Sequence, residues 1–417
     1  MNNNPFSSNT FISVWSKHFS ANKPLTSFDF ITDLFFVKHP FLPVYTNVGK
    51  THTKGIDYHL SSQNTKDYKK KVCLIYDAPT YFNIEIKTDS TTLKVHRIKQ
   101  YPGFLISLND FNGFDDYFTT TFRKSSRYKL KKYKRKLELC FDIQYKMLFG
   151  DISKEEYDSV FGYFKELLEK RFAYKKVTNN NLDNKEWSFY LDVAYPMILE
   201  KKASLFVIYA NSVPIGVTLN YFSDSILFDA ITVFDMDYSK FHLGSVTIMK
   251  LIEWCFENNI ETFDFSKGYF DYKKRWATKT YPFEYHIYYD SESMISKTIA
   301  YGIKSFYTLK QSLRDRNINE KLHKLTFWCR NLINPDDSRI TYEFKSVKDE
   351  VSMESADRIN IDLPENQFLK PMVFDFLYVE NESFSQLKLY RLENKTKSYL
   401  LEGGTAKAVL NVLNKAT

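Results

Sequence analysis

Residues 204–276 contain the side chains of this sequence that are best suited to chemistry. Asp264 stands between two phenylalanines in a short apolar run that predicts a buried strand. A carboxylate in such a strand must find hydrogen-bond donors or hold a proton, so Asp264 is either a satisfied structural anion or a base with a raised pKa. Asp229, inside another predicted strand, is the second candidate base.

A short cluster after the Asp264 strand adds a proton donor and a cation. Tyr272 can protonate a leaving group, and Lys273 can hold an anionic substrate. Trp276 follows Tyr272 by four residues, so the two rings either border a substrate or form the core-facing stripe of one helix. The residue pattern leaves both interpretations open.

A predicted helix that opens at Gly244, directly after a strand and an irregular turn, is the third feature. Its first backbone N–H groups and the positive end of its dipole can hold a phosphate, although Gly244 is equally consistent with an ordinary helix start. His242 in the turn can act as a general base or contact a phosphate, or it is an exposed residue with neither role.

The positive charge of the chain is concentrated in one segment. The 417 residues carry a formal net charge of +8, and residues 123–136 contain nine Arg or Lys and no acid, so the remainder sums to −1. Apolar residues recur here at spacings of three and four, which predicts an amphipathic helix. Such a helix can bind RNA, anionic lipid or an anionic substrate, or its charges are simply solvated.

Hydrophobic periodicity predicts a mixed α/β protein with three parts, 1–121, 122–290 and 291–417. For the first part we expect a helix at 11–19, an exposed loop at 48–70, and strands at 71–77, 81–86, 93–98 and 104–108. For the second part we expect the basic helix, a strand at 141–147, a helix at 153–172, a helix at 187–199 that Pro196 kinks or breaks, a meander at 205–234, a helix at 244–258 and a strand at 261–265. For the third part we expect one long or broken basic helix over 294–330, strands at 340–344, 373–379, 386–391 and 397–401, and a short final helix.

Composition narrows the class of protein further. The four cysteines, Cys73, Cys140, Cys255 and Cys329, lie far apart without metal-ligand spacing, which favours free thiols in a reducing cytoplasm and no bound metal. The sequence shows no signal-peptide pattern and no apolar stretch of the roughly 18 residues that a membrane span needs. We therefore expect a cytoplasmic protein.

The order of the elements and three motifs resemble the GNAT acyltransferases. More narrowly, they resemble the CelD-like acetyltransferases of cellulose-biosynthesis clusters, relatives of the two-lobed FemAB-type aminoacyl transferases. The motifs are the basic helix 122–137, Phe-Asp-Phe at 263–265 ahead of Gly268, and Tyr-Lys at 272–273 followed by Trp276.

The resemblance implies tandem GNAT-like lobes with mixed central sheets flanked by helices, plus a small C-terminal α+β extension. It also implies that acetyl-CoA is the acyl donor, with its pantetheine along Val233 and Phe234. Its pyrophosphate would lie on the turn and helix start, which contribute Ser239, His242, Leu243, Gly244 and Ser245. Ordinary members carry Gln/Arg-x-x-Gly-x-Gly/Ala there, and this sequence keeps only the last glycine.

By the same resemblance, an amine or hydroxyl of a sugar or cell-envelope precursor attacks the thioester directly. This fits the absence of a recognisable Ser or Cys nucleophile motif. Asp264 or Asp229 would be the base and Tyr272 the acid, while Lys273, Trp276 and Arg127 would contact the acceptor. Two alternatives stay open: transfer from aminoacyl-tRNA bound at helix 123–136, and a non-catalytic binding protein that keeps the fold.

Overall fold

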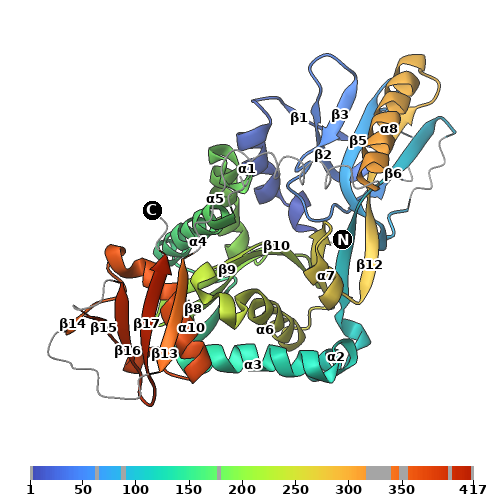
Figure 1. Ribbon diagram of the computed structural model, residues 1–417. Helices are drawn as coiled ribbons and strands as arrows, with labels where there is room; N and C mark the ends of the chain where they lie inside the picture. The colour runs from blue at the N-terminus through green and yellow to red at the C-terminus, as the bar shows by residue number, and fades with distance from the viewer. Residues whose placement is uncertain are drawn as a thin grey trace.

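The computed structural model describes residues 3–61, 65–85, 91–175, 180–315, 340–346, 356–392 and 397–414. A 12-stranded mixed sheet forms the body of the molecule (Figure 1), which confirms the predicted mixed α/β class. Its strands are, in spatial order, β1 (Leu25–Phe28), β2 (Ile31–Lys38), β3 (Val44–Asn47), β5 (Val72–Pro79), β12 (Lys279–Asp290), β6 (Leu93–Ser107), β11 (Thr262–Lys267), β10 (Ile226–Phe234), β9 (Val213–Phe222), β8 (Ala203–Ala210) and β7 (Ile143–Leu148), with β4 (His59–Leu60) paired to β2. The pairs β3/β5 and β10/β11 are parallel, and the other pairs are antiparallel.

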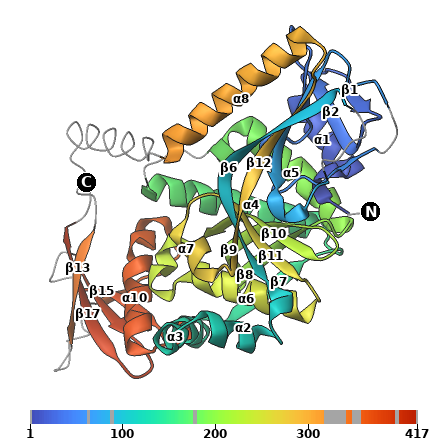
Figure 2. The same cartoon turned by 90° about the vertical axis from the view of Figure 1, so that its right-hand side faces the viewer.

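The sheet continues across the predicted boundary between the first two parts of the chain. Strand β12 lies between β5 and β6, which come from the first 121 residues, and β6 also pairs with β11. Figure 2 shows β6 and β12 side by side through the middle of the molecule. The two segments therefore share one hydrogen-bonded sheet.

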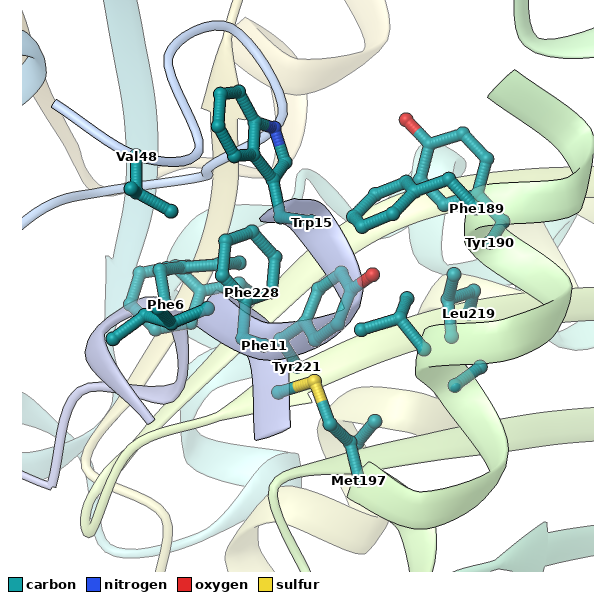
Figure 3. Packing of buried hydrophobic residues seen from close by; sticks show 14 of the residues in the cluster. Phe6, Phe11, Trp15, Val48, Phe189, Tyr190, Met197, Leu219, Tyr221 and Phe228 are labelled. Atoms are coloured by element: carbon teal, nitrogen blue, oxygen red, sulfur yellow. The ribbon is translucent and has the colours of Figure 1, made fainter. Parts of the chain in front are cut away.

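Helices cover both faces of this sheet. One face carries α1 (Asn9–Phe19), α4 (Lys154–Lys175) and α5 (Asn184–Leu199), and Figure 3 shows Phe11 and Trp15 of α1 packing beside Phe189 of α5 and the strand residues Tyr221 and Phe228. The other face carries α2 (Phe114–Thr121), α3 (Lys124–Cys140) and α6 (Leu243–Glu257), and α8 (Met294–Asp315) covers β5, β6 and β12. Among the described residues, no helix combines the length and apolar character needed to cross a membrane. The short elements are η1 (Pro5–Ser7), η2 (Thr80–Phe82), η3 (Leu108–Asp110), η4 (Asn180–Leu182), η5 (Met236–Phe241) and α7 (Asp271–Trp276).

The described C-terminal residues form a second, five-stranded sheet. Its spatial order is β13 (Thr341–Ser346), β17 (Lys407–Asn414), β16 (Ser398–Glu402), β15 (Lys388–Leu392) and β14 (Ala356–Arg358), accompanied by η7 (Pro364–Leu369), α10 (Lys370–Glu380) and η8 (Phe384–Gln386). Helix α10 packs on α3, where Lys136 Nζ donates to the Tyr378 carbonyl at 2.5 Å and Cys140 Sγ donates to the Leu377 carbonyl at 3.4 Å. Figure 1 shows this sheet beside one end of α3.

Most predicted elements are present: the meander lies where periodicity predicted it, and so do helices α1, α3, α4, α5 and α6. The start of α4 is capped by a side chain, because the Glu156 amide donates to Ser153 Oγ at 3.1 Å. Helix α5 contains Pro196 and ends one turn later, so no break occurs near Tyr195. The predicted helix over 294–330 is α8 up to Asp315, and its remainder lies outside the described residues.

Four local predictions in short apolar or polar runs are wrong. The strands expected at 93–98 and 104–108 are one strand, since β6 runs through Pro102, which pairs with Pro282 of β12. The strand expected from residue 81 is replaced by η2 and irregular chain over the described residues 81–85. At the C-terminus, 373–379 is helix α10 instead of a strand, and the final helix is strand β17, because short apolar runs do not distinguish the two states.

The predicted exposed loop at 48–70 is the fifth error, and it bears on the site. Ile56 and Tyr58 are buried, and the Tyr58 hydroxyl bonds to His286 and Tyr288 of β12. The lysine-rich composition of this segment gave no sign of the burial, which depends on distant residues such as Asn4, whose Nδ2 donates to the Gly55 carbonyl at 2.9 Å. Lys54, one of the five lysines of residues 48–70, is partly buried with this segment.

Candidate functional site

Strands β10 and β11 separate partway along their length. They pair in parallel at Ile226↔Thr262, Leu227↔Phe263 and Phe228↔Asp264, and no later pair joins them although β10 continues to Phe234. Strand β10 also carries an irregularity between Asp229 and Ile231 in its pairing with β9. A bulge increases local twist, so the outer half of β10 turns away from β11 at this point.

Asp229 lies at this irregularity. Its side chain is partly exposed, and Thr232 Oγ1 donates to its Oδ1 at 2.9 Å. Burial raises the pKa of Asp229, while Thr232 and the positive charges of Lys273 and Lys54 oppose that rise. Asp229 is thus shielded from bulk water and still accessible, which is the environment of a tuned base.

Lys54 is the cation that sequence reasoning missed here. Burial and the like charges of Lys267 and Lys273 lower the pKa of Lys54 to about 8, against the opposite effect of Asp77 and Asp229. Lys54 therefore belongs to a cluster of three lysines and two carboxylates, whose charges act on it. The members are Lys54, Lys267, Lys273, Asp77 and Asp229. A lysine with such a pKa can hold or release a proton near neutral pH.

Asp264 lies on β11, the strand that ends at Lys267, and has no exposed surface. The Tyr281 hydroxyl donates to both of its oxygens at 2.7 and 2.6 Å, the Tyr81 hydroxyl donates to Oδ2 at 2.9 Å, and the Ser266 amide donates to Oδ1 at 2.7 Å. Burial raises its pKa to about 6 in spite of these donors. Asp264 is therefore both a satisfied anion and a carboxyl with a raised pKa, and it has no exposed surface for an acceptor to touch.

Lys273 holds the end of β11. Its side chain is 6% exposed overall, and Nζ donates to the carbonyls of Phe265, Ser266 and Lys267 at 2.6, 3.3 and 2.9 Å. Three acceptors use all three hydrogens of an ammonium group. The backbone here includes Ser266 in the left-handed region with φ 59°, so Lys273 stabilises a strained turn beside the candidate site.

Tyr272 lies on α7 near Asp229, and its ring meets the edge of Phe265 at a centroid distance of 6.2 Å. Burial and the Asp229 carboxylate raise the pKa of Tyr272, and Arg171 acts against this rise. Its hydroxyl therefore stays protonated at neutral pH. Tyr272 keeps 37% of its surface exposed, so the predicted proton donor is accessible.

Arg171 is the second residue that the sequence did not single out. It projects from α4 to the outer half of β10, where Nη1 donates to the Thr232 carbonyl at 3.1 Å and the guanidinium lies 4.7 Å from the centre of the Phe234 ring. Its buried Nε has no hydrogen-bond partner among the described residues. Arg171 thus brings an unused donor to the free edge of β10.

The start of α6 is built around a close approach. A Cβ on Gly244 would lie 2.9 Å from the Phe234 ring, so glycine is needed for packing whatever else it does. His242 precedes the helix in the left-handed region with φ 51° and its ring lies on Tyr133 at a centroid distance of 4.0 Å. Burial and the charge of Arg275 lower the pKa of His242, so the imidazole is mainly neutral at pH 7.

The other predicted contact residues divide between core and surface. Val233 and Leu243 are buried in the hydrophobic clusters, whereas Ser239 is exposed and Ser245 partly exposed. Trp276 is 0% exposed and packs edge-on against Phe122, so it is a core residue with no surface for an acceptor.

Arg127 closes the end of α2, because Nη1 donates to the carbonyls of Thr119 and Phe122 at 3.0 and 2.7 Å. It belongs to the basic helix α3, which presents only part of its charge to solvent. Its basic residues with partners inside the molecule are Arg127, Lys131, Lys132, Lys134 and Lys136. Its exposed basic residues include Arg123, Lys124, Lys129 and Arg135.

Several solved structures align with this chain at low sequence identity. A conserved protein of unknown function from Bacteroides thetaiotaomicron has 10% identity and a TM-score of 0.45, with 69% of this chain and 91% of that chain covered. The C-terminal domain of a putative lysylphosphatidylglycerol synthetase from Agrobacterium fabrum has 10% identity, a TM-score of 0.40 and coverages of 64% and 84%. FemX has 11% identity, a TM-score of 0.41 and coverages of 61% and 83%.

No protein with a curated description matches this sequence. One family model does match, and it covers the segment that contains α3, the meander, the separated strands β10 and β11, and α7 as far as Lys274. Over residues 122–274, this chain matches the family of acetyltransferase (GNAT) domains.

Proposed function

We propose that this protein is an acyltransferase that uses an acyl-CoA, with acetyl-CoA as the expected donor. The observation that supports it best is the separation of β10 from β11 after Phe228 and Asp264. A free strand edge offers backbone donors and acceptors to an extended, amide-containing ligand, and the pantetheine arm of CoA is such a ligand. Asp229 and Tyr272, an accessible base and a protonated acid, lie where the strands part.

The donor's phosphates would lie at the start of α6. This sequence keeps only the last glycine of the family's motif there and lacks its basic residue. Arg171 of α4, however, lies on the Phe234 ring, which also contacts Gly244 at the helix start. Arg275, whose charge acts on His242, adds a second cation. Together with the positive helix end, these side chains can replace the missing basic residue.

In the proposed reaction, an amine or hydroxyl of a sugar or cell-envelope precursor attacks the thioester carbonyl. The new bond joins the acceptor nitrogen or oxygen to the acyl carbon, and the C–S bond breaks. Asp229 takes the acceptor's proton, and Tyr272 protonates the departing thiolate. Asp264 and Lys273 act as positioning residues that hold the end of β11, and no covalent enzyme intermediate forms.

Calorimetric titration of the full chain with acetyl-CoA tests the donor, and release of free CoA thiol in the presence of amino sugars tests the transfer. Saturable binding together with acceptor-dependent thiol release is the expected result. No binding at millimolar acetyl-CoA would refute the proposed donor. Binding without transfer to any amine or hydroxyl pool would favour the non-catalytic alternative.

The exposed basic residues of α3 favour a second candidate, transfer from aminoacyl-tRNA. Arg123, Lys124 and Lys129 carry no acidic neighbour within their helix segment and are open to solvent. If this helix binds tRNA, their replacement by Glu abolishes salt-dependent tRNA retention. The matched control is Lys154→Glu on α4, outside the basic helix.

We also infer a cytoplasmic location. The three described cysteines, Cys73, Cys140 and Cys255, are free and buried, as in proteins of reducing compartments.

A further inference from the structure

A cavity of about 320 Å³ lies between the end of α8, the residues after β3 and the end of β11. Its wall is aromatic, because Tyr76, Tyr285 and Tyr307 line it and are all buried. The rings of Tyr285 and Tyr307 stack at a centroid distance of 3.9 Å, and the hydroxyls of Tyr76 and Tyr307 bond to each other. The volume suits a small ligand.

Positive charge surrounds this wall. Lys50, Lys310 and Arg314 line the cavity, and its one lining carboxylate, Asp77, is already paired with Lys267 at 2.5 Å. Lys310 and Arg314 lie four residues apart on α8, where like charges repel. Burial and the Arg314 charge lower the pKa of Lys310. A bound anion would relieve this repulsion.

Arg314 is held ready for such an anion. Its guanidinium lies 4.0 Å from the centre of the Tyr101 ring, which restricts the plane of the group. A planar guanidinium offers parallel donors to two oxygens of one phosphate, and the two lysines can neutralise the remaining charge. Because Lys50, Lys310 and Arg314 all line the cavity, a doubly charged phosphate suits it better than a ligand with one carboxylate.

Asp77 provides an independent observation. Its side chain has no exposed surface; Oδ2 accepts from Lys267, and Oδ1 has no hydrogen-bond partner among the described residues. A buried carboxylate oxygen without a donor is costly, so a ligand with a hydroxyl group would stabilise this wall of the cavity. The ligand thus needs an anionic end and a hydroxyl-bearing body.

We propose that this cavity binds a phosphorylated sugar. The phosphate lies among Lys50, Lys310 and Arg314, a hydroxyl donates to Asp77 Oδ1, and the sugar ring lies on the tyrosine wall. The Lys267–Asp77 pair connects the cavity to the lysine cluster around Asp229, so a bound sugar is a neighbour of the proposed acyl site. The inference concerns binding alone and does not require acyl transfer.

Calorimetric titration of the full chain without any acyl donor tests the inference, with glucose 6-phosphate, inorganic phosphate and glucose as probes. We expect saturable binding of glucose 6-phosphate, at least tenfold tighter than that of inorganic phosphate. The double variant Lys310→Gln/Arg314→Gln should weaken it at least tenfold, whereas Lys297→Gln, an exposed site elsewhere on α8, should not change it. Because the donor is absent, the outcome is independent of the acyltransferase proposal.

Three results would overturn the inference. They are no saturable binding of glucose 6-phosphate to the unchanged protein, affinity for inorganic phosphate equal to that for glucose 6-phosphate, and unchanged affinity in the double variant. Melting curves establish that each variant is folded. Should the double variant not fold, Arg314→Lys keeps the charge, loses the planar fork, and is expected to weaken binding at least threefold.

Discussion

The Tyr281 hydroxyl donates to both oxygens of Asp264, at 2.7 and 2.6 Å, and both residues are buried in the sheet. Tyr81 and the Ser266 amide complete the set of donors. These hydrogen bonds join β11 to β12 and η2. The Asp264 carboxylate therefore holds β11, the strand that borders the proposed acyl site, in place. Four predictions about Asp264 and the residues of the candidate site can be measured.

Asp264 makes stability depend on pH in a defined direction. Its pKa of about 6 in the folded protein lies above its ordinary value of 3.8, so the folded state favours the protonated carboxyl. That contribution is fully present below about pH 4 and is lost as pH rises through about 6, at a cost of roughly 3 kcal/mol. We expect the unfolding free energy of the unchanged protein, relative to Asp264→Asn, to fall by this amount between about pH 4 and pH 7 in guanidinium titrations. A difference that stays constant over this range would contradict the assignment.

Replacing Asp229 by Asn should lower kcat about 100- to 10,000-fold, because general-base catalysis contributes on this scale. The dissociation constant of acetyl-CoA should not change, since the substitution keeps the shape of the side chain and its contact with Thr232. In the unchanged protein, kcat should rise with pH through the raised pKa of Asp229, because the base must be deprotonated. Asp224→Asn, at an exposed position in the β9–β10 turn, is the control. Equal activity of the two variants would exclude Asp229 as the base.

Arg171→Gln should weaken acetyl-CoA binding at least tenfold, because a charge-assisted hydrogen bond is worth about 1.5–3 kcal/mol. The matched control is Lys165→Gln, which removes a partly exposed charge from the same helix. Calorimetry measures both variants at two salt concentrations, and the loss should shrink at high salt. Identical affinities for the two variants would remove Arg171 from the donor site.

Lys273→Met should destabilise the protein by roughly 2–4 kcal/mol, because three carbonyls at the end of β11 lose a charged donor in a buried place. The neighbouring Lys274→Met changes an exposed side chain and should stay within about 0.5 kcal/mol. Denaturant midpoints measure both. A small effect for Lys273→Met would show that solvent replaces the ammonium group, and the turn would then not depend on it.

The sequence predicted correctly those elements that depend on neighbouring residues. The meander, α6 and β11 follow from alternation, helical period and caps, which are properties of neighbouring residues. The same local signals failed in β6, where a Pro-Gly pair predicts a turn but lies inside a long strand. They also failed in α10, because a short, mainly apolar run fits a strand or a buried helix equally well.

Only some residues of the candidate site could be predicted from the sequence. Asp229, Asp264 and Tyr272 stand out because their types and neighbours are unusual, and the structure places them around the end of the β10/β11 pairing. Lys54 and Arg171 carry no such local signal, since one lies in a polar loop and the other on an amphipathic helix. Their roles arise from burial, which depends on segments far away in the chain.

The sequence by itself determined the order strand, helix, strand and the location of the positive charge on one helix, because both depend on residues next to one another. Only the tertiary structure decided that Lys273 serves the backbone, that Trp276 belongs to the core and that Asp264 is shared by two tyrosines. The physical reason is that desolvation and hydrogen-bond partners are set by residues such as Tyr81, 183 positions from Asp264. No local pattern records a contact of that separation.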